Sequence, residues 1–264
     1  MTIIESILLG GVQGATEFIP VSSSGHLEIV EVLLGGNALD FHMFLQFVNI
    51  GTLLALLIFY RKKLLDIGRK IVKGDWKLAR NVLLTSIPAG LVGMLLADRI
   101  ENSDILGSMW LVATMLGVVG MVMILVDKLP KMSAVKEGSK LSPKRALAIG
   151  VVQMFALIPG VSRSGSTILA GRVCGMDSKA AADYSFLASI PIMFGVMLKL
   201  VLSPANRAYF SDHALTIVIS NIVALVAGLL AIKFVLTFLK REGNLQKFGW
   251  YRVAVAVLIF IFLV

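Results

Sequence analysis

The chain has 264 residues, of which 57% are hydrophobic and 16% are charged, and its mean hydropathy is +0.88. This composition excludes an ordinary soluble domain, because long apolar runs separated by bunched charges are typical of polytopic helical membrane proteins. The net charge of +9 lies between the apolar runs, and no soluble basic region with interleaved aromatic residues is present. We therefore expect bilayer lipids as neighbours and no nucleic-acid partner.

The first segment, residues 1–36, is too polar for one membrane span and too long for a simple loop. Thr2 to Phe18 predicts one half-helix, Pro20 interrupts it, and Ser22 to Leu34 predicts a second half-helix. Broken helices at membrane depth are tolerated where protein or a water-filled cavity covers the freed backbone groups. The segment therefore predicts a re-entrant helical hairpin.

The apolar runs that follow predict three spans and close a first repeat over 1–127; the spans are 41–60, 81–97 and 106–126. Basic residues gather after the first and third spans, the second group forming a linker at 128–145. The positive-inside rule places both groups in the cytoplasm.

A second repeat is predicted over 146–264. It begins with another broken stretch, 146–176, in which Pro159 and Gly160 interrupt an apolar run. Its three spans are predicted at 179–202, 214–239 and 250–264.

The two broken stretches resemble each other at an offset of 140 residues. Gln13, Ser22, Ser24 and Gly25 recur as Gln153, Ser162, Ser164 and Gly165. Because three spans separate the hairpins, and three is odd, the halves are inverted and their tips can meet near the midplane. We therefore predict an all-α polytopic integral membrane protein of two inverted-topology repeats, each a re-entrant helical hairpin plus three transmembrane helices.

Both predicted tips carry residues that suit an anion. Serine and glycine at a helix start leave free N–H groups at the positive end of the helix dipole. Arg163 adds a planar donor fork for phosphate oxygens, although it could instead be a loop or snorkelling residue. The expected phosphate-binding residues are Ser22, Ser24, Gly25, Ser162, Ser164 and Gly165.

Two spacings in the first hairpin suggest further chemistry. Gln13 and Glu17 are four residues apart on one helix face, where their oxygens could hold a divalent cation or could serve packing. Ser23 and His26 are three apart, which suits a nucleophile and its base. The alternative is that His26 only caps the helix or binds phosphate.

Together these residues resemble the undecaprenyl-diphosphate phosphatase family, also called the bacitracin-resistance family. The first family motif stands here as Gln13-x-x-x-Glu17 followed by residues 18–26, FIPVSSSGH, and the second as residues 159–167, PGVSRSGST. The resemblance spans nearly the whole chain. It implies a metal-dependent hydrolase that converts undecaprenyl diphosphate to the monophosphate carrier of cell-wall assembly and confers bacitracin resistance.

The resemblance also implies roles for single residues. Glu17 and Gln13 would serve a divalent cation, Mg²⁺ or Ca²⁺, and the diphosphate. Ser23 would be the nucleophile with His26 as its base, although direct attack by water is the alternative. Arg163, Ser162 and Thr167 would hold the phosphate.

The sequence departs from the family pattern at three positions. Gln13 stands where the pattern allows Glu or Gln, Leu45 replaces a usual acid, and Asn49 replaces a usual Gln. These changes concern metal coordination or head-group recognition. They also leave open a lipid-binding relative without activity.

The rival hypothesis is a transporter or flippase of polyprenyl phosphates, because inverted repeats with broken helices are typical of transporters. The presence of Glu17, Ser23 and His26 favours chemistry. We expect a multi-pass protein of the bacterial inner membrane whose site opens to the periplasmic side, with a polyprenyl diphosphate as partner. Two copies of the chain could also form a homodimer.

Overall fold

The computed structural model describes the chain except for residues 36–37, 102, 104–105 and 129–134. The last residue of the first predicted hairpin and most of the first half of the predicted linker therefore lie outside the described residues. The helices are α1 Ile3–Phe18, α2 Ser23–Leu34, α3 Ala38–Val72, α4 Lys77–Glu101, α5 Met109–Asp127, η1 Gly138–Lys140, α6 Pro143–Met154, η2 Phe155–Leu157, α7 Arg163–Val173, α8 Ser178–Leu202, α9 Pro204–Phe238 and α10 Leu245–Phe262. The described residues contain no strand, and the predicted all-α class is confirmed.

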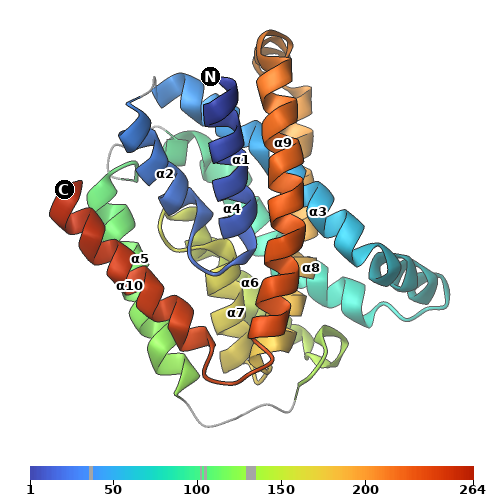
Figure 1. Cartoon of the computed structure of the whole chain (residues 1–264). Helices are drawn as coiled ribbons and strands as arrows, with labels where there is room; N and C mark the ends of the chain where they lie inside the picture. Colours follow the sequence, from blue (N-terminus) through green and yellow to red (C-terminus); the bar gives the residue numbers. More distant parts are fainter. Residues whose placement is uncertain (36–37, 102, 104–105, 129–134) are drawn as a thin grey trace.

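Each broken stretch forms a helix, a loop and a second helix. α1 and α2 make the first hairpin, and α6, η2 and α7 make the second. The hairpins enter the molecule from opposite ends and their loops lie at its centre (Figure 1). Opposed hairpins are what an inverted repeat requires, while the relation between the two sets of three spans stays a prediction.

Six helices are long and apolar enough to cross a membrane, and each coincides with one predicted span. Two of these helices extend well beyond the predicted spans. α3 continues to Val72, through residues expected to form a loop, and α9 already begins at Pro204 with a kink at His213 (φ −121°). Hydropathy marks where a helix leaves the hydrocarbon layer, but the helix can continue in water because charged side chains tolerate helical geometry.

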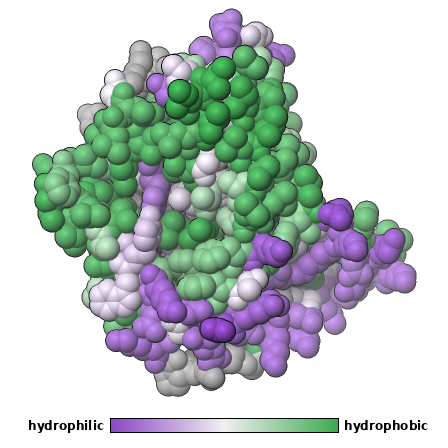
Figure 2. Space-filling model, in the orientation of Figure 1, coloured by the Kyte–Doolittle hydropathy of each residue, from purple (hydrophilic) through white to green (hydrophobic). Residues whose placement is uncertain are grey.

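The surface separates into hydrophobic and hydrophilic regions. Hydrophobic residues form a broad belt, and hydrophilic residues gather at the bottom and lower right of the view, where α3 ends and α4 begins (Figures 1 and 2). This distribution defines a multi-pass membrane protein, because lipid-facing side chains must be apolar. The basic residues of 61–80 lie in that hydrophilic region.

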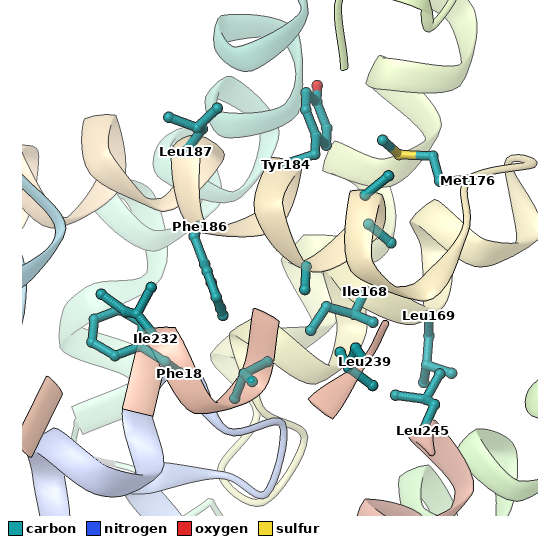
Figure 3. Packing of buried hydrophobic residues seen from close by; sticks show 14 of the residues in the cluster. Phe18, Ile168, Leu169, Met176, Tyr184, Phe186, Leu187, Ile232, Leu239 and Leu245 are labelled. Carbon is teal, nitrogen blue, oxygen red and sulfur yellow. The ribbon is translucent and has the colours of Figure 1, made fainter. Parts of the chain in front are cut away.

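The buried core surrounds the inner ends of the hairpins. Phe18, the last residue of α1, packs edge to face on Phe186 of α8 with ring centroids 5.5 Å apart, and Ile232 of α9 lies beside them (Figure 3). α1 also approaches α9 closely, since a Cβ at Gly14 would lie 2.5 Å from the carbonyl oxygen of Ala224. Small residues at such contacts allow membrane helices to pack backbone to backbone. The packing holds the end of α1, and the Glu17 that it carries, in one place.

Candidate active site

The two hairpin loops end in the same unusual turn. Ser22 (φ 75°) and Ser162 (φ 76°) are the two residues other than glycine with positive φ in the described chain. Each caps the following helix, Ser22 Oγ accepting from the N–H of Gly25 at 3.4 Å and Ser162 Oγ from that of Gly165 at 3.1 Å. A serine in this conformation costs about 1–3 kcal/mol, and such strain concentrates at functional sites.

In each turn, the serine two positions after the capping serine contacts it through its hydroxyl. Ser24 lies with its Oγ 3.2 Å from that of Ser22, and Ser164 lies with its Oγ 3.2 Å from that of Ser162. Ser164 also donates to the carbonyl of Ile19 at 3.5 Å, which joins the two loops. The predicted anion-binding residues therefore form two adjacent helix starts.

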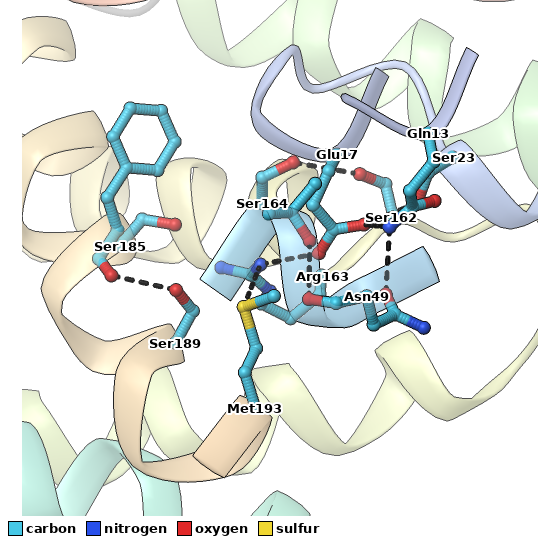
Figure 4. Close-up of polar contacts among 12 residues, drawn as sticks. Gln13, Glu17, Ser23, Asn49, Ser162, Arg163, Ser164, Ser185, Ser189 and Met193 are labelled. Atoms are coloured by element: carbon cyan, nitrogen blue, oxygen red, sulfur yellow. Dashed lines mark hydrogen bonds and ion pairs between the residues drawn. The ribbon is translucent and has the colours of Figure 1, made fainter. Parts of the chain in front are cut away.

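Glu17 is the centre of the polar contacts between the loops (Figure 4). Its Oε1 accepts a hydrogen bond from Arg163 Nη2 at 2.7 Å, which is also an ion pair between the two hairpins. Its Oε2 accepts from Ser23 Oγ at 2.7 Å and from Gln13 Nε2 at 3.1 Å. The Glu17 and Arg163 side chains are only 13% and 16% exposed, so this pair is weakly screened by water.

The 140-residue offset shows that the two hairpins contribute different groups. Adding 140 to 23 gives Arg163, and adding 140 to 17 gives Leu157. The first hairpin thus supplies a hydroxyl and a carboxylate, and the second supplies a cation and an apolar residue. The two matching turns therefore contribute different groups to the site.

A cavity of about 220 Å³ lies against this centre. Glu17, Arg163, Asn49, Gln46 and Gln153 provide its polar wall, and the remaining lining residues are apolar. Gln153 Oε1 and Arg163 Nη1 are buried without a hydrogen-bond partner among the described residues. Polar atoms left in this way beside a cavity are suited to a ligand or to water.

His26 does not lie against Ser23 as the spacing had predicted. Its Nδ1 is 2.7 Å from the carbonyl oxygen of Ser22, and its Nε2 is 2.8 Å from the hydroxyl of Tyr251. A carbonyl oxygen can only accept, so Nδ1 carries a proton; in the neutral ring Nε2 then accepts from the Tyr251 hydroxyl. The predicted Ser23–His26 pair is therefore not formed, because the Ser23 hydroxyl turns back to Glu17 on the preceding helix.

Thr167 lies one helical turn away from the loop. Its Oγ1 donates to the carbonyl of Arg163 at 2.8 Å and lies 2.5 Å from Ser185 Oγ. These contacts connect α7 with α8 in the interior, since Thr167 is 1% exposed. The structure therefore brings Gln13, Glu17, Ser23 and Arg163 together but gives Thr167 a bracing position.

The structure adds Arg252 to the site and gives Asn49, named above only as a departure from the family pattern, a direct contact. Asn49 Oδ1 accepts from Gln13 Nε2 at 2.8 Å, so two of the three departures from the family pattern contact each other. Arg252, in α10, is fully buried and donates to carbonyls of both loops. An arginine inside an apolar span was the signal that could have found it.

The residues around Glu17 can hold a divalent cation only with help from a ligand. The described residues contain no group of three or more His, Cys, Asp or Glu placed for a metal. Glu17 supplies one carboxylate and Gln13 one amide oxygen, while Mg²⁺ is commonly held by one or two carboxylates plus substrate phosphates. In the described arrangement Gln13 turns its Nε2 toward Glu17, so a cation held with a diphosphate would rest on Glu17 and would need the Gln13 amide to turn its oxygen inward.

The fold and the site define a class: a multi-pass membrane protein with a charged, anion-suited centre at the tips of two opposed hairpins. Residues 6–258 match the family described as Bacitracin resistance protein BacA. The chain belongs to this family.

Individual relatives agree with this membership over nearly their whole length. The chain is 35% identical to an undecaprenyl-diphosphatase of Porphyromonas gingivalis, covering 99% of this chain and 96% of that protein. It is also 35% identical to one from Rubrobacter xylanophilus, covering 98% and 97%. The identity to undecaprenyl-diphosphatase 3 of Acinetobacter baylyi is 33%, covering 97% and 96%.

Proposed function

We propose that this protein hydrolyses undecaprenyl diphosphate to undecaprenyl phosphate and inorganic phosphate, and that it confers bacitracin resistance by recycling this lipid carrier for cell-wall synthesis. The observation that carries the proposal is the contact of Glu17 with both Ser23 and Arg163 across the two hairpins. A carboxylate that accepts a hydrogen bond from a serine hydroxyl is suited to proton transfer. A transporter needs to bind an anion but needs no such pair.

The substrate explains why the site lies inside a membrane protein. Its polyprenyl tail stays in the hydrocarbon layer while its diphosphate reaches the hairpin tips. Arg163 Nη1, which has no partner among the described residues, donates to a phosphate oxygen together with the N–H groups at the starts of α2 and α7. These donors stabilise negative charge that develops on the phosphate oxygens.

Glu17 has a distinct role in the chemical step. It accepts the proton of the attacking hydroxyl, which belongs either to Ser23 or to a water in the adjacent cavity. The attacking oxygen forms a bond to the terminal phosphorus while the bond from that phosphorus to the bridging oxygen breaks, and the lipid monophosphate leaves. If Ser23 attacks, a water then cleaves the phosphoserine and releases inorganic phosphate.

Glu17 and Gln13 are the residues that would hold a Mg²⁺ or Ca²⁺ ion together with the diphosphate. Such an ion, when bound, neutralises phosphate charge and polarises the phosphorus–oxygen bond. His26 has a supporting role in this proposal, since it binds the loop through Ser22 and the last span through Tyr251.

The protein acts in the bacterial inner membrane, and the site opens to the periplasmic side. The support is the direction of the first hairpin, which enters from the end opposite the basic residues of 61–80 (Figures 1 and 2). A homodimer is a further proposal, and the mass of the purified protein in detergent, measured by light scattering, tests it.

The test is phosphate release from undecaprenyl diphosphate by the purified protein in detergent, with Mg²⁺, with Ca²⁺ and with EDTA. We expect release that depends on the added cation and on Glu17. Lipid binding without release under every cation would instead support transport or an inactive lipid-binding relative.

A further inference from the structure

Arg252 is a buried arginine whose hydrogen-bond partners are all backbone carbonyls. It lies in α10 and is 0% exposed. Its Nη1 donates to Pro20 at 3.2 Å, its Nη2 to Gly160 at 2.6 Å and to Val161 at 3.1 Å, and its Nε to Leu116 of α5 at 3.4 Å. The planar fork of a guanidinium can serve several acceptors at once, which an ammonium cannot do in this geometry.

These acceptors belong to both loops of the site. Pro20 lies in the first loop, two residues before Ser22, and Val161 in the second loop immediately precedes Ser162. In a trans peptide the carbonyl and the next N–H point in opposite directions. By holding the Val161 carbonyl, Arg252 therefore directs the N–H of Ser162 away from itself and orients the strained turn before α7.

Packing alone does not explain an arginine at this position. Burying a charge is costly unless it is compensated, and a long apolar side chain would fill the space between α5 and α10 without that cost. Among the described residues, Arg252 donates these hydrogen bonds to backbone carbonyls and to no carboxylate. Carbonyl oxygens accept from each of its three nitrogens but leave its positive charge close to both loops.

We propose that Arg252 is a positioning residue that ties the two hairpin loops to each other. It holds Ser23 and Glu17 of the first hairpin at a fixed spacing from Arg163 of the second, without touching the reacting phosphate. The expected effect on kcat rests on the proposed hydrolase function, whereas the expected coupling of the two loops does not.

The test compares Arg252→Met, which removes the donors and the charge, with Arg252→Lys, which keeps the charge but loses the fork. The matched control is Arg241→Met, an exposed arginine in the segment before the same helix. We expect Arg252→Met to lower kcat about 100-fold, the size of effect that small misplacements of catalytic groups produce. KM should change much less than kcat, Arg252→Lys should lie between, and the control should behave as the unchanged protein.

Hydrogen–deuterium exchange in detergent provides the readout that does not depend on activity. We expect residues 19–25 and 158–165 to exchange faster together in both variants, because each loop loses the bonds that join it to the other. Faster exchange confined to α5 and α10 would overturn the proposal and leave Arg252 a packing residue, as would an unchanged kcat in an active protein. If the unchanged protein releases no phosphate, the proposed function fails, and the exchange of the two loops still decides the role of Arg252.

Discussion

Ser23 donates a hydrogen bond to Oε2 of Glu17 over 2.7 Å, so the carboxylate at the end of one half-helix holds the hydroxyl at the start of the next. This contact crosses the break in the first hairpin. It makes Glu17, and not His26, the group next to the predicted nucleophile. Five predictions test this arrangement and its surroundings.

Ser23→Ala distinguishes the two routes of hydrolysis. If Ser23 is the nucleophile, phosphate release falls by at least about 100-fold, because a covalent route cannot proceed without the hydroxyl. Release by the purified variant is compared with that of Ser211→Ala, an exposed serine of α9. Activity within a few-fold of the unchanged protein would assign the attack to water and leave Ser23 a binding role.

The Glu17–Arg163 ion pair should be sensitive to the loss of one partner. Arg163→Met leaves a largely buried carboxylate without its cation, so we expect a loss of about 3 kcal/mol in stability. The double variant Glu17→Gln with Arg163→Met should recover most of the melting temperature but none of the activity. Thermal unfolding in detergent measures both effects.

The control for the ion pair is Asp66→Asn in the exposed pair that Asp66 forms with Lys70 at 2.9 Å. Water and salt screen such a pair, so its loss should shift the melting temperature little. If Arg163→Met lowered the melting temperature as little as Asp66→Asn, the buried pair would not stabilise the protein as proposed.

Gln13→Glu should strengthen the dependence on a divalent cation. It places a second carboxylate beside Glu17, where like charges repel unless a cation lies between them. In EDTA, we expect the variant to melt at a lower temperature than the unchanged protein does. With Mg²⁺, we expect the variant to reach half-maximal activity at a lower Mg²⁺ concentration. KCl of equal ionic strength is the control, and equal Mg²⁺ profiles of the two proteins would argue against a cation at Glu17.

Tyr251→Phe tests the role of His26. The change removes the donor to Nε2 while Nδ1 keeps its bond to the Ser22 carbonyl. One neutral hydrogen bond contributes about 1 kcal/mol, so we expect kcat to fall by about fivefold at most. His26→Ala should cost more, because the strained Ser22 turn also loses a partner, and equal activity of the two variants would refute this order.

Gly160→Ala should destabilise the second loop. Gly160 has φ 87°, and an added Cβ would lie 2.6 Å from the carbonyl oxygen of Val112. Overpacking of this kind costs about 1–3 kcal/mol beyond the strain of a left-handed alanine. Gly74→Ala is the matched control, because Gly74 has φ 86° and open space around its Cβ position. Equal melting temperatures of the two variants would show that the loop yields around the methyl group.

Much of the fold follows from local sequence. The hydrophobic runs predicted the six long apolar helices, and Pro20 and Pro159 with their serine turns predicted the two breaks. These features depend on residues close together in the chain, where hydropathy and capping act. α3 and α9 extend beyond the predicted spans, because hydropathy reports the edge of the bilayer and carries no signal for a helix that continues beyond it.

The partners inside the site depended on the tertiary structure. The sequence by itself determined which residues would lie at the hairpin tips, since the serines, Glu17 and Arg163 flank the breaks. Only the packed structure decided that Ser23 contacts Glu17, that His26 contacts Tyr251, and that Arg252 holds both loops. Arg252 and Pro20 are 232 positions apart in the chain, and only packing between helices brings such distant residues into contact.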